Sequence, residues 1–204
     1  MRIKICGVTS AADAKLCADE GADFIGLIFA KSSPRLVAAA AARRIVKALP
    51  RGMTPVAVVR DQPIDEVRAL LEETGIKRAQ LHGAEDPAYA RAVGVPVIKV
   101  FDRFSKRDLE RLRRYDVFAY MVDLPKTAAS AHGVIDAGFA LNAKNYGPVI
   151  VSGRLDSANV GGLVRRVDPF AVDVCSSTER APGKKDRRRV RAFIEAVRHA
   201  AAPV

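Results

Sequence analysis

Cysteine is scarce in this sequence. The 204 residues contain three cysteines, Cys6, Cys17 and Cys175, and no two of them have the paired spacing of a structural zinc site. So few and so scattered cysteines exclude a disulfide scaffold, and we expect three free thiols, with Cys17 and Cys175 packed in the interior. Histidine, cysteine and acidic residues form no cluster with ligand spacing either, which argues against a metal site.

Long apolar runs are also missing. The first residues, MRIKICGVTS, carry no apolar run of the length that a signal peptide or a membrane span requires. We therefore expect a soluble, cytoplasmic protein with no membrane partner.

Aromatic residues make up only 6% of the chain, whereas 34 basic residues face 23 acidic ones, a net charge of +11 that favours an anionic partner. The basic runs at 111–114 and 184–191, however, alternate with apolar residues as exposed helix faces do. No strand combines aromatic and basic residues as RNA-binding strands do. We expect no nucleic-acid partner; the alternative, DNA binding through net charge, predicts salt-dependent retention.

Short apolar runs alternate regularly with segments of helical spacing. Eight runs rich in Val and Ile predict strands at 3–6, 24–28, 54–59, 78–81, 95–100, 117–122, 148–151 and 171–174. The helical segments are at 11–20, 38–49, 64–73, 106–114, 158–167 and 187–200. Thr9 or Ser10 is suited to begin the first helix and Ser157 the helix at 158–167, while Gly21 and Gly75 are suited to end two of them.

Continuous apolar strands separated by helices predict a parallel sheet that is covered on its outer face. Eight such units close into a (β/α)8 barrel, the TIM-barrel fold. We expect one barrel domain over residues 1–204, short for a fold that usually takes ~250 residues. The alternative is an open doubly wound sheet, but the first strand ends in ICGVT, without the glycine-rich turn that binds dinucleotides.

In a barrel of this kind the chemistry takes place where the strands end. The reactive side chains at the predicted strand ends are Cys6, Gln80, His82, Asp123 and Asp173. Because side chains alternate along a strand, Lys4 should point into the barrel together with Cys6. Lys99 is predicted to point inward as well, with Asp123 and Asp173 as the available carboxylate partners.

The turns after the last two predicted strands have the composition of a phosphate site. Gly153 lets the backbone approach a ligand closely, and Ser176 and Ser177 add hydroxyl groups after the final strand. Backbone N–H groups at this end of a barrel often bind phosphate. The sequence thus predicts a small phosphorylated substrate.

Five motifs spread over the chain carry a family resemblance. They are KICGVT at 4–9, GADFIG at 21–26, SPR at 33–35, QLHG at 80–83 and PGKKD at 182–186, the last taken as the lead-in to a helix. Together they resemble the phosphoribosylanthranilate isomerase family of tryptophan biosynthesis, over essentially the whole length.

The resemblance implies a cofactor-free Amadori rearrangement of N-(5'-phosphoribosyl)anthranilate. An acid protonates the ribose ring oxygen, and a base then removes the C2' proton. Asp123 matches the family's general acid, Cys6 its general base, and Arg35 the residue that holds the anthranilate carboxylate. Gln80 and His82, which share a strand face, would line the site.

Both proton-transfer groups need a pKa near neutrality. We expect the nearby Lys4 to lower the pKa of the Cys6 thiol, and partial burial to raise the pKa of the Asp123 carboxyl.

Three departures from the family pattern concern the glycine-rich loops. The loop after the general acid is replaced by residues 129–133, the usual Gly-Gly-Leu turn reads Gly153-Arg154-Leu155 or Ser152-Gly153, and Ser177 stands where a glycine is usual. They motivate the alternative of a divergent barrel that binds or isomerises a different phosphorylated sugar. The sequence leaves open whether the protein is a monomer or a homodimer.

Overall fold

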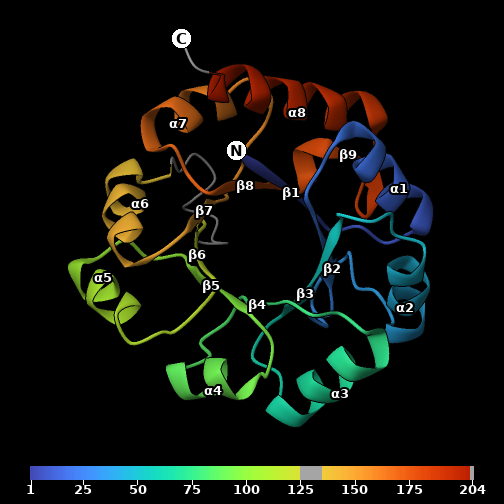
Figure 1. Ribbon diagram of the computed structural model, residues 1–204, viewed down its shortest axis with the longest axis horizontal. Helices are drawn as coiled ribbons and strands as arrows, with labels where there is room; N and C mark the ends of the chain where they lie inside the picture. Colours follow the sequence, from blue (N-terminus) through green and yellow to red (C-terminus); the bar gives the residue numbers. More distant parts are fainter. Residues whose placement is uncertain (125–134, 203–204) are drawn as a thin grey trace.

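The computed structural model describes residues 1–124 and 135–202. Its centre is a closed barrel of eight parallel strands, in which each strand pairs with the next and β1 pairs with β8 (Figure 1). The strands are β1 (Arg2–Cys6), β2 (Phe24–Ile28), β3 (Thr54–Val59), β4 (Ala79–Leu81), β5 (Val97–Phe101), β6 (Ala119–Val122), β7 (Val149–Val151) and β8 (Ala171–Val174). The predicted (β/α)8 barrel is confirmed.

Helices alternate with the strands and surround the barrel (Figure 1). They are α1 (Ala11–Glu20), α2 (Ala39–Lys47), α3 (Ile64–Thr74), α4 (Pro87–Ala92), α5 (Lys106–Leu112), α6 (Ala137–Ala143), α7 (Val160–Val167) and α8 (Arg187–Ala201), with the short 3-10 helices η2 (Lys144–Tyr146) and η3 (Ser176–Thr178). The ends of the predicted elements differ from the observed ends by at most two residues. The sequence analysis did not assign α4 or α6, although Asp86 and Pro87 are a typical start for α4.

Local side-chain chemistry explains several helix ends. Ser10 Oγ accepts a hydrogen bond from the Asp13 N–H at 3.1 Å and begins α1, and Gly21 ends it in the left-handed conformation. The prediction that Ser157 begins α7 is wrong. The Asp156 carboxylate accepts hydrogen bonds from the backbone N–H groups two and three residues later, which forms a turn there and delays the helix to Val160.

Two apolar clusters make up the core. The larger one lies between the strands and the helices, and the smaller one fills the barrel interior with Phe24, Val56, Ile98, Val100, Ala119, Met121, Ile150 and Ala171. Phe118 and Phe170 pack against the interior cluster with their rings edge to face. The guanidinium of Arg78 stacks 3.8 Å from the Phe118 ring centroid. Side chains therefore fill the barrel below its carboxyl-terminal mouth.

Strand alternation places one lysine inside the barrel and another outside. Ile3 and Ile5 belong to the outer cluster, so Lys4 and Cys6 face inward, as predicted. The prediction that Lys99 points inward is wrong, because Ile98 occupies an inner position of β5 and turns its neighbour outward.

Lys99 is instead paired with a glutamate. Its ammonium lies 2.8 Å from Glu85 Oε2 and 2.7 Å from the Gly83 carbonyl oxygen, and both charged side chains are 2% exposed. The Glu85 carboxylate also accepts hydrogen bonds from the backbone N–H groups of Asp61 and Gly83. Glu85 thus ties the loop after β3 to the loop after β4.

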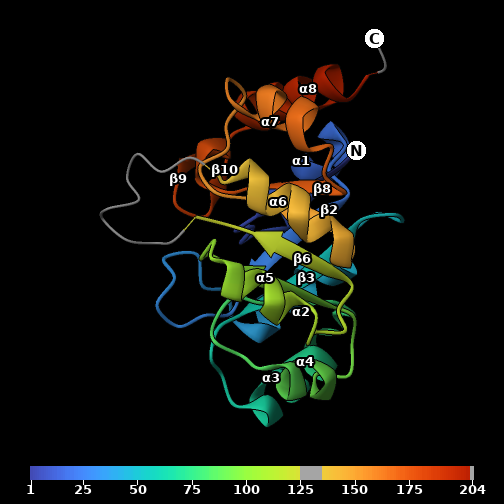
Figure 2. The same ribbon diagram turned by 90° about the vertical axis from the view of Figure 1, so that its left-hand side faces the viewer.

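A small hairpin follows β8 where the sequence analysis expected only a helix lead-in. It consists of β9 (Glu179–Ala181) and β10 (Lys184–Lys185) and turns at Gly183, whose φ is +76°. Figure 2 shows it at the end of the barrel away from the N-terminus.

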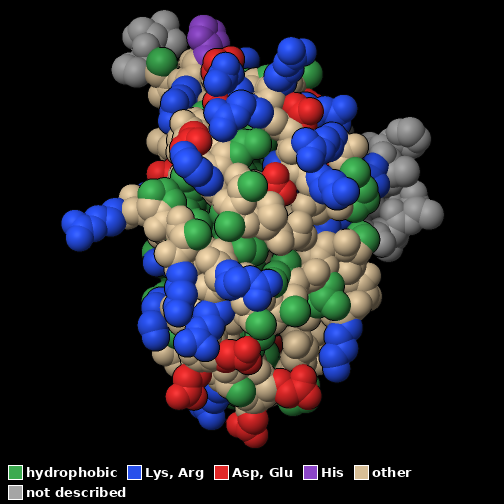
Figure 3. Space-filling view, turned by 90° about the vertical axis from the view of Figure 1, so that its right-hand side faces the viewer, with side chains coloured by type: hydrophobic (Ala, Val, Ile, Leu, Met, Phe, Trp, Pro, Cys, Tyr) green, Lys and Arg blue, Asp and Glu red, His purple; other side chains and the backbone are tan. Residues whose placement is uncertain are grey.

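Lys and Arg side chains are spread over the face seen in Figure 3, interspersed with acidic ones. No helix in the described part of the chain is long and apolar enough to span a membrane.

Replacing Glu85 with alanine should destabilise the fold. The substitution leaves the Lys99 ammonium buried without its carboxylate, which typically costs about 3–5 kcal/mol. Denaturant unfolding measures the loss. Glu66→Ala, which removes an exposed carboxylate from α3, should stay within about 0.5 kcal/mol of the parent; equal effects of the two substitutions would contradict the assignment.

Candidate active site

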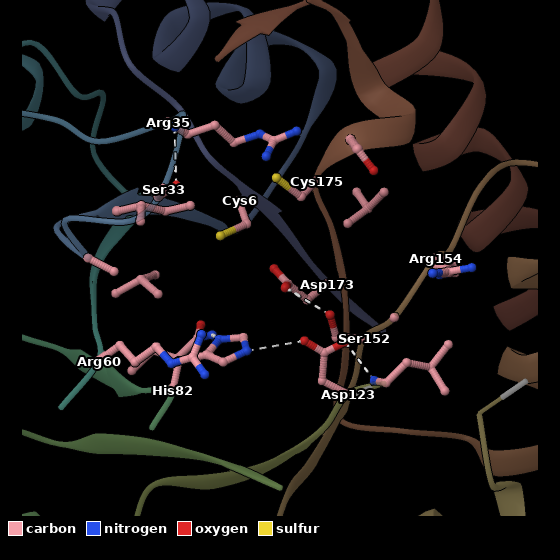
Figure 4. Close-up of a pocket in the computed structure, with 18 of the residues that line it drawn as sticks. Cys6, Ser33, Arg35, Arg60, His82, Asp123, Ser152, Arg154, Asp173 and Cys175 are labelled. Carbon is pink, nitrogen blue, oxygen red and sulfur yellow. Dashed lines mark hydrogen bonds and ion pairs between the residues drawn. The ribbon is translucent and has the colours of Figure 1, made fainter. Parts of the chain in front are cut away.

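A cavity of about 470 Å³ opens at the carboxyl ends of the strands. Figure 4 shows side chains from β1, β6 and β8 converging on it, together with the loop that carries Ser33 and Arg35. Eight of the nine predicted site residues line this cavity, namely Cys6, Arg35, Gln80, His82, Asp123, Gly153, Asp173 and Ser176. The ninth, Ser177, is not among its lining residues.

A buried ion pair lies directly below the cavity. The Lys4 ammonium is 2.7 Å from Asp173 Oδ1, and both residues are buried. Burial alone would lower the pKa of Lys4, but the carboxylate of Asp173 and the thiolate of Cys6 outweigh it and raise that pKa. Ser152 Oγ donates to the second carboxylate oxygen of Asp173 at 3.2 Å. The prediction that Asp173 balances an inward lysine is confirmed.

Cys6 and Cys175 form a pair of thiols in the cavity. The register of β1 and β8 pairs Ile5 with Val174, so the next residues of the two strands lie side by side. Cys6 is buried, and both residues line the cavity (Figure 4). The expectation that Cys175 only packs in the interior is wrong, because the end of β8 turns its sulfur toward the mouth.

The two thiols have opposite pKa shifts. A hydrogen bond from Cys175 lowers the pKa of Cys6 to about 7, against the effect of burial and with help from the ammonium groups of Lys4 and Lys185. The same hydrogen bond, together with burial, raises the pKa of Cys175. Cys6 is therefore the thiol of the pair that ionises more readily, while the Cys175 Sγ also donates to Glu179 Oε1 at 4.0 Å. Lys4 does lower the pKa of Cys6, as expected, but the neighbouring thiol has the larger effect.

A chain of three polar side chains forms the opposite wall. Gln80 Nε2 lies 3.1 Å from His82 Nδ1, and His82 Nε2 lies 3.4 Å from Asp123 Oδ2. Asp123 Oδ1 accepts the Leu124 N–H at 2.8 Å. Cys6 and Asp123 thus reach one cavity from β1 and β6.

Arg35 has a carboxylate partner within the protein. Its Nε and Nη2 donate to the Glu179 carboxylate at 2.7–3.0 Å, the paired geometry that a guanidinium fork favours. The Lys185 ammonium lies 3.1 Å from the same carboxylate and donates to the Cys6 carbonyl oxygen at 2.6 Å. Neither Glu179 nor Lys185 was predicted from the sequence as a site residue. Lys185 stood in the PGKKD motif, which was the available signal.

The turn after β7 depends on a glycine. Gly153 has a φ of +102°, and a Cβ there would lie 2.9 Å from the Leu124 nitrogen and 3.0 Å from Asp123 Oδ1. A side chain at this position would therefore push against the candidate acid. Arg154 follows with a φ of +53°, a left-handed conformation that costs energy for a non-glycine residue.

The turn after β8 is the 3-10 helix η3. Ser177 Oγ donates to the Leu155 carbonyl oxygen at 2.6 Å, so its hydroxyl ties η3 to the turn after β7. Of the predicted departures, residues 129–133 lie outside the described residues. Within 1–124 and 135–202, no group of three histidine, cysteine or acidic side chains is placed to hold a metal ion.

The protein is a closed parallel barrel with a polar cavity at the carboxyl ends of its strands, which is where (β/α)8-barrel enzymes have their active sites. These features place it in the class of (β/α)8-barrel enzymes. A family model described as N-(5'phosphoribosyl)anthranilate (PRA) isomerase matches residues 3–196. The chain belongs to this family.

Relatives of known name agree along the full length. The N-(5'-phosphoribosyl)anthranilate isomerase of Geobacter sp. (strain M21) is 38% identical over 197 residues, which cover 95% of this chain and 96% of the relative. The enzyme of that name from Rubrobacter xylanophilus is 37% identical over 203 residues, covering 97% and 98% of the two chains.

Solved structures agree as well. The phosphoribosyl anthranilate isomerase of Thermus thermophilus has a TM-score of 0.88 at 35% identity, with 98% of this chain and 99% of that chain covered. A structure of the enzyme with reduced 1-(o-carboxyphenylamino)-1-deoxyribulose 5-phosphate has a TM-score of 0.86 at 30% identity, with the same coverage.

Removing the sulfur of Cys175 should shift the activity profile to higher pH. Without its donor, the pKa of Cys6 should rise from about 7 toward the ~8.5 of an ordinary thiol. With Cys6 as the general base that the family resemblance implies, the ascending limb of the kcat profile of Cys175→Ala, measured in the isomerase assay, should move with that pKa. Cys17→Ala, which removes a thiol buried in α1, should leave the limb in place. An unshifted limb in Cys175→Ala would contradict the role of the thiol pair.

Proposed function

We propose that this protein acts as an N-(5'-phosphoribosyl)anthranilate isomerase in tryptophan biosynthesis. The reaction converts N-(5'-phosphoribosyl)anthranilate to 1-(2-carboxyphenylamino)-1-deoxyribulose 5-phosphate. The observation that carries this proposal is the family match over residues 3–196. A cavity lined by both a thiol and a carboxylate supports the same chemistry.

The first step asks for an acid, and Asp123 is suited to supply it. Its protonated carboxyl group gives a proton to the ribose ring oxygen, the C1'–O bond breaks, and the nitrogen lone pair forms the iminium. His82, with its Nε2 3.4 Å from the carboxylate, is placed to orient Asp123. Gln80 in turn holds His82 by the hydrogen bond to Nδ1.

The second step asks for a base, which we assign to Cys6. Its thiolate removes the C2' proton of the iminium and leaves an enolamine, which becomes the aminoketose when the C2' hydroxyl loses its proton and C1' gains one. A pKa of about 7 makes the thiolate available at neutral pH. Lys4, paired with Asp173, keeps a positive charge below the thiolate.

The two charged ends of the substrate have distinct candidate sites. We assign the phosphate to the turns after β7 and β8, where Gly153 and Ser176 line the cavity and Ser177, whose hydroxyl donates to the Leu155 carbonyl oxygen, holds the two turns together. Arg35 is the candidate for the anthranilate carboxylate, at the side of the mouth formed by the loop after β2. Asp173 also lines the cavity, and we assign it to the substrate-binding residues.

We further propose that residues 1–204 work as one barrel domain in the cytoplasm, as a monomer or homodimer, without a cofactor or a nucleic-acid partner. The solved enzyme of Thermotoga maritima, 30% identical to this chain, is described as dimeric. Light scattering during gel filtration distinguishes the two assembly states.

Removing either proton-transfer group should abolish turnover while binding persists. Cys6→Ala and Asp123→Asn should each lower kcat by about 100-fold or more, because each removes one proton transfer. Steady-state kinetics followed by anthranilate fluorescence gives kcat and KM. The matched controls are Cys17→Ala and Asp116→Asn, which lie outside the cavity. A variant of Cys6 or Asp123 with near-parental kcat would show that its role is wrongly assigned.

Growth of a tryptophan auxotroph that lacks this isomerase tests the function itself. The wild-type gene should restore growth without tryptophan, and the Asp123→Asn gene should not. A soluble, expressed wild-type protein that fails to rescue growth would favour the alternative of a divergent barrel for another phosphorylated sugar.

A further inference from the structure

A second arginine lies in the cavity on the same side as Arg35. Arg60 directly follows β3 and lines the cavity. In Figure 4 Arg60 lies beside His82, on the side of the cavity opposite Asp173 and Arg154, whereas the Arg35 side chain lies beyond Ser33. The two arginines are carried by the loops that follow β2 and β3, which are neighbouring strands of the barrel.

The two guanidinium groups differ in how strongly the protein already holds them. Arg35 makes three hydrogen bonds of 2.7–3.0 Å with Glu179, and its side chain is only 19% exposed. Arg60 is 51% exposed, and its ion pair with Asp61 is 3.8 Å long. Asp61 Oδ1 meanwhile accepts the Ala84 N–H at 2.6 Å, a tighter contact than the one with Arg60. The fork of Arg60 is therefore the more available of the two.

The substrate of the proposed reaction is an anion at both ends. Its phosphate has candidate partners in the turns after β7 and β8, so its carboxylate is directed to the opposite edge of the mouth. There, Nε and Nη2 of Arg35 are engaged by Glu179, which leaves Nη1 as its free edge. A carboxylate has two oxygens and about four acceptor positions, more than one guanidinium edge satisfies.

We propose that Arg60 is a substrate-binding residue that selects for the carboxylate of the aromatic amine. On substrate binding, the half-exposed side chain of Arg60, next to His82, donates its fork to the carboxylate, which also accepts from the free edge of Arg35. This inference rests on the proposed isomerase function. It adds a specificity determinant from the loop after β3, which none of the five sequence motifs contains.

A substrate without the carboxylate provides the test. N-(5'-phosphoribosyl)aniline, formed from aniline in place of anthranilate, keeps the phosphate, the ribose and the reacting nitrogen. Arg60→Ala should raise KM for the anthranilate substrate about tenfold, the loss typical of a hydrogen bond to a charged group, with kcat little changed. The same variant should leave KM for the aniline substrate as in the wild type.

Two further variants separate recognition from general electrostatics. Arg60→Lys keeps the charge but not the fork and should fall between wild type and Arg60→Ala. Arg103→Ala removes an exposed charge from the loop after β5, outside the cavity lining, and should change neither KM.

The outcomes are distinct. An unchanged KM for the anthranilate substrate in Arg60→Ala, or equal rises for both substrates, would overturn the assignment of Arg60. A wild-type protein that consumes neither substrate would instead overturn the proposed function. A tenfold rise confined to the carboxylate-bearing substrate supports both.

Discussion

The ion pair between Lys4 and Asp173 is the interaction on which the site depends. It joins β1 to β8, the two strands that close the barrel, at the position where their register pairs these two residues. Both groups are buried, so neither charge is tolerable without the other. One step further along the same strands, the register places Cys6 beside Cys175. The ion pair that closes the barrel therefore also fixes the thiol pair and provides the cation below it.

The carboxylates at the barrel mouth are paired with lysine and arginine side chains close to the Cys6 thiol. Lys185 bridges the carbonyl oxygens of Cys6 and Cys175 and contacts Glu179, while Glu179 occupies Arg35. Burial by itself would raise the pKa of Glu179, but the hydrogen bonds and positive charges of Arg35 and Lys185 outweigh it and hold that pKa below its ordinary value. Asp173 thus faces the Lys4 ammonium, and Glu179 faces Arg35 and Lys185, so both of these carboxylates are paired with cations.

Much of this arrangement could be predicted from the sequence. Apolar runs at regular intervals predicted all eight strands, and alternation along β1 placed Lys4 and Cys6 on one face. Contacts between distant segments could not be predicted. Lys99 looked inward from its strand alone, but the inner positions of β5 belong to Ile98 and Val100, and its partner Glu85 comes from the loop after another strand. Glu179 and Lys185 were not predicted because a hairpin brings them to the mouth. Its strands are too short to show an alternating pattern in the sequence.

The filled barrel interior has a kinetic consequence. Below the cavity, Ile98, Met121 and Ile150 are fully buried, and the stacked arginine and phenylalanines close the floor. A ligand therefore cannot pass along the barrel axis, and it must enter and leave through the same mouth of the cavity. Bound product therefore blocks the binding of the next substrate molecule. When the chemical steps are fast, the rate of product release limits turnover.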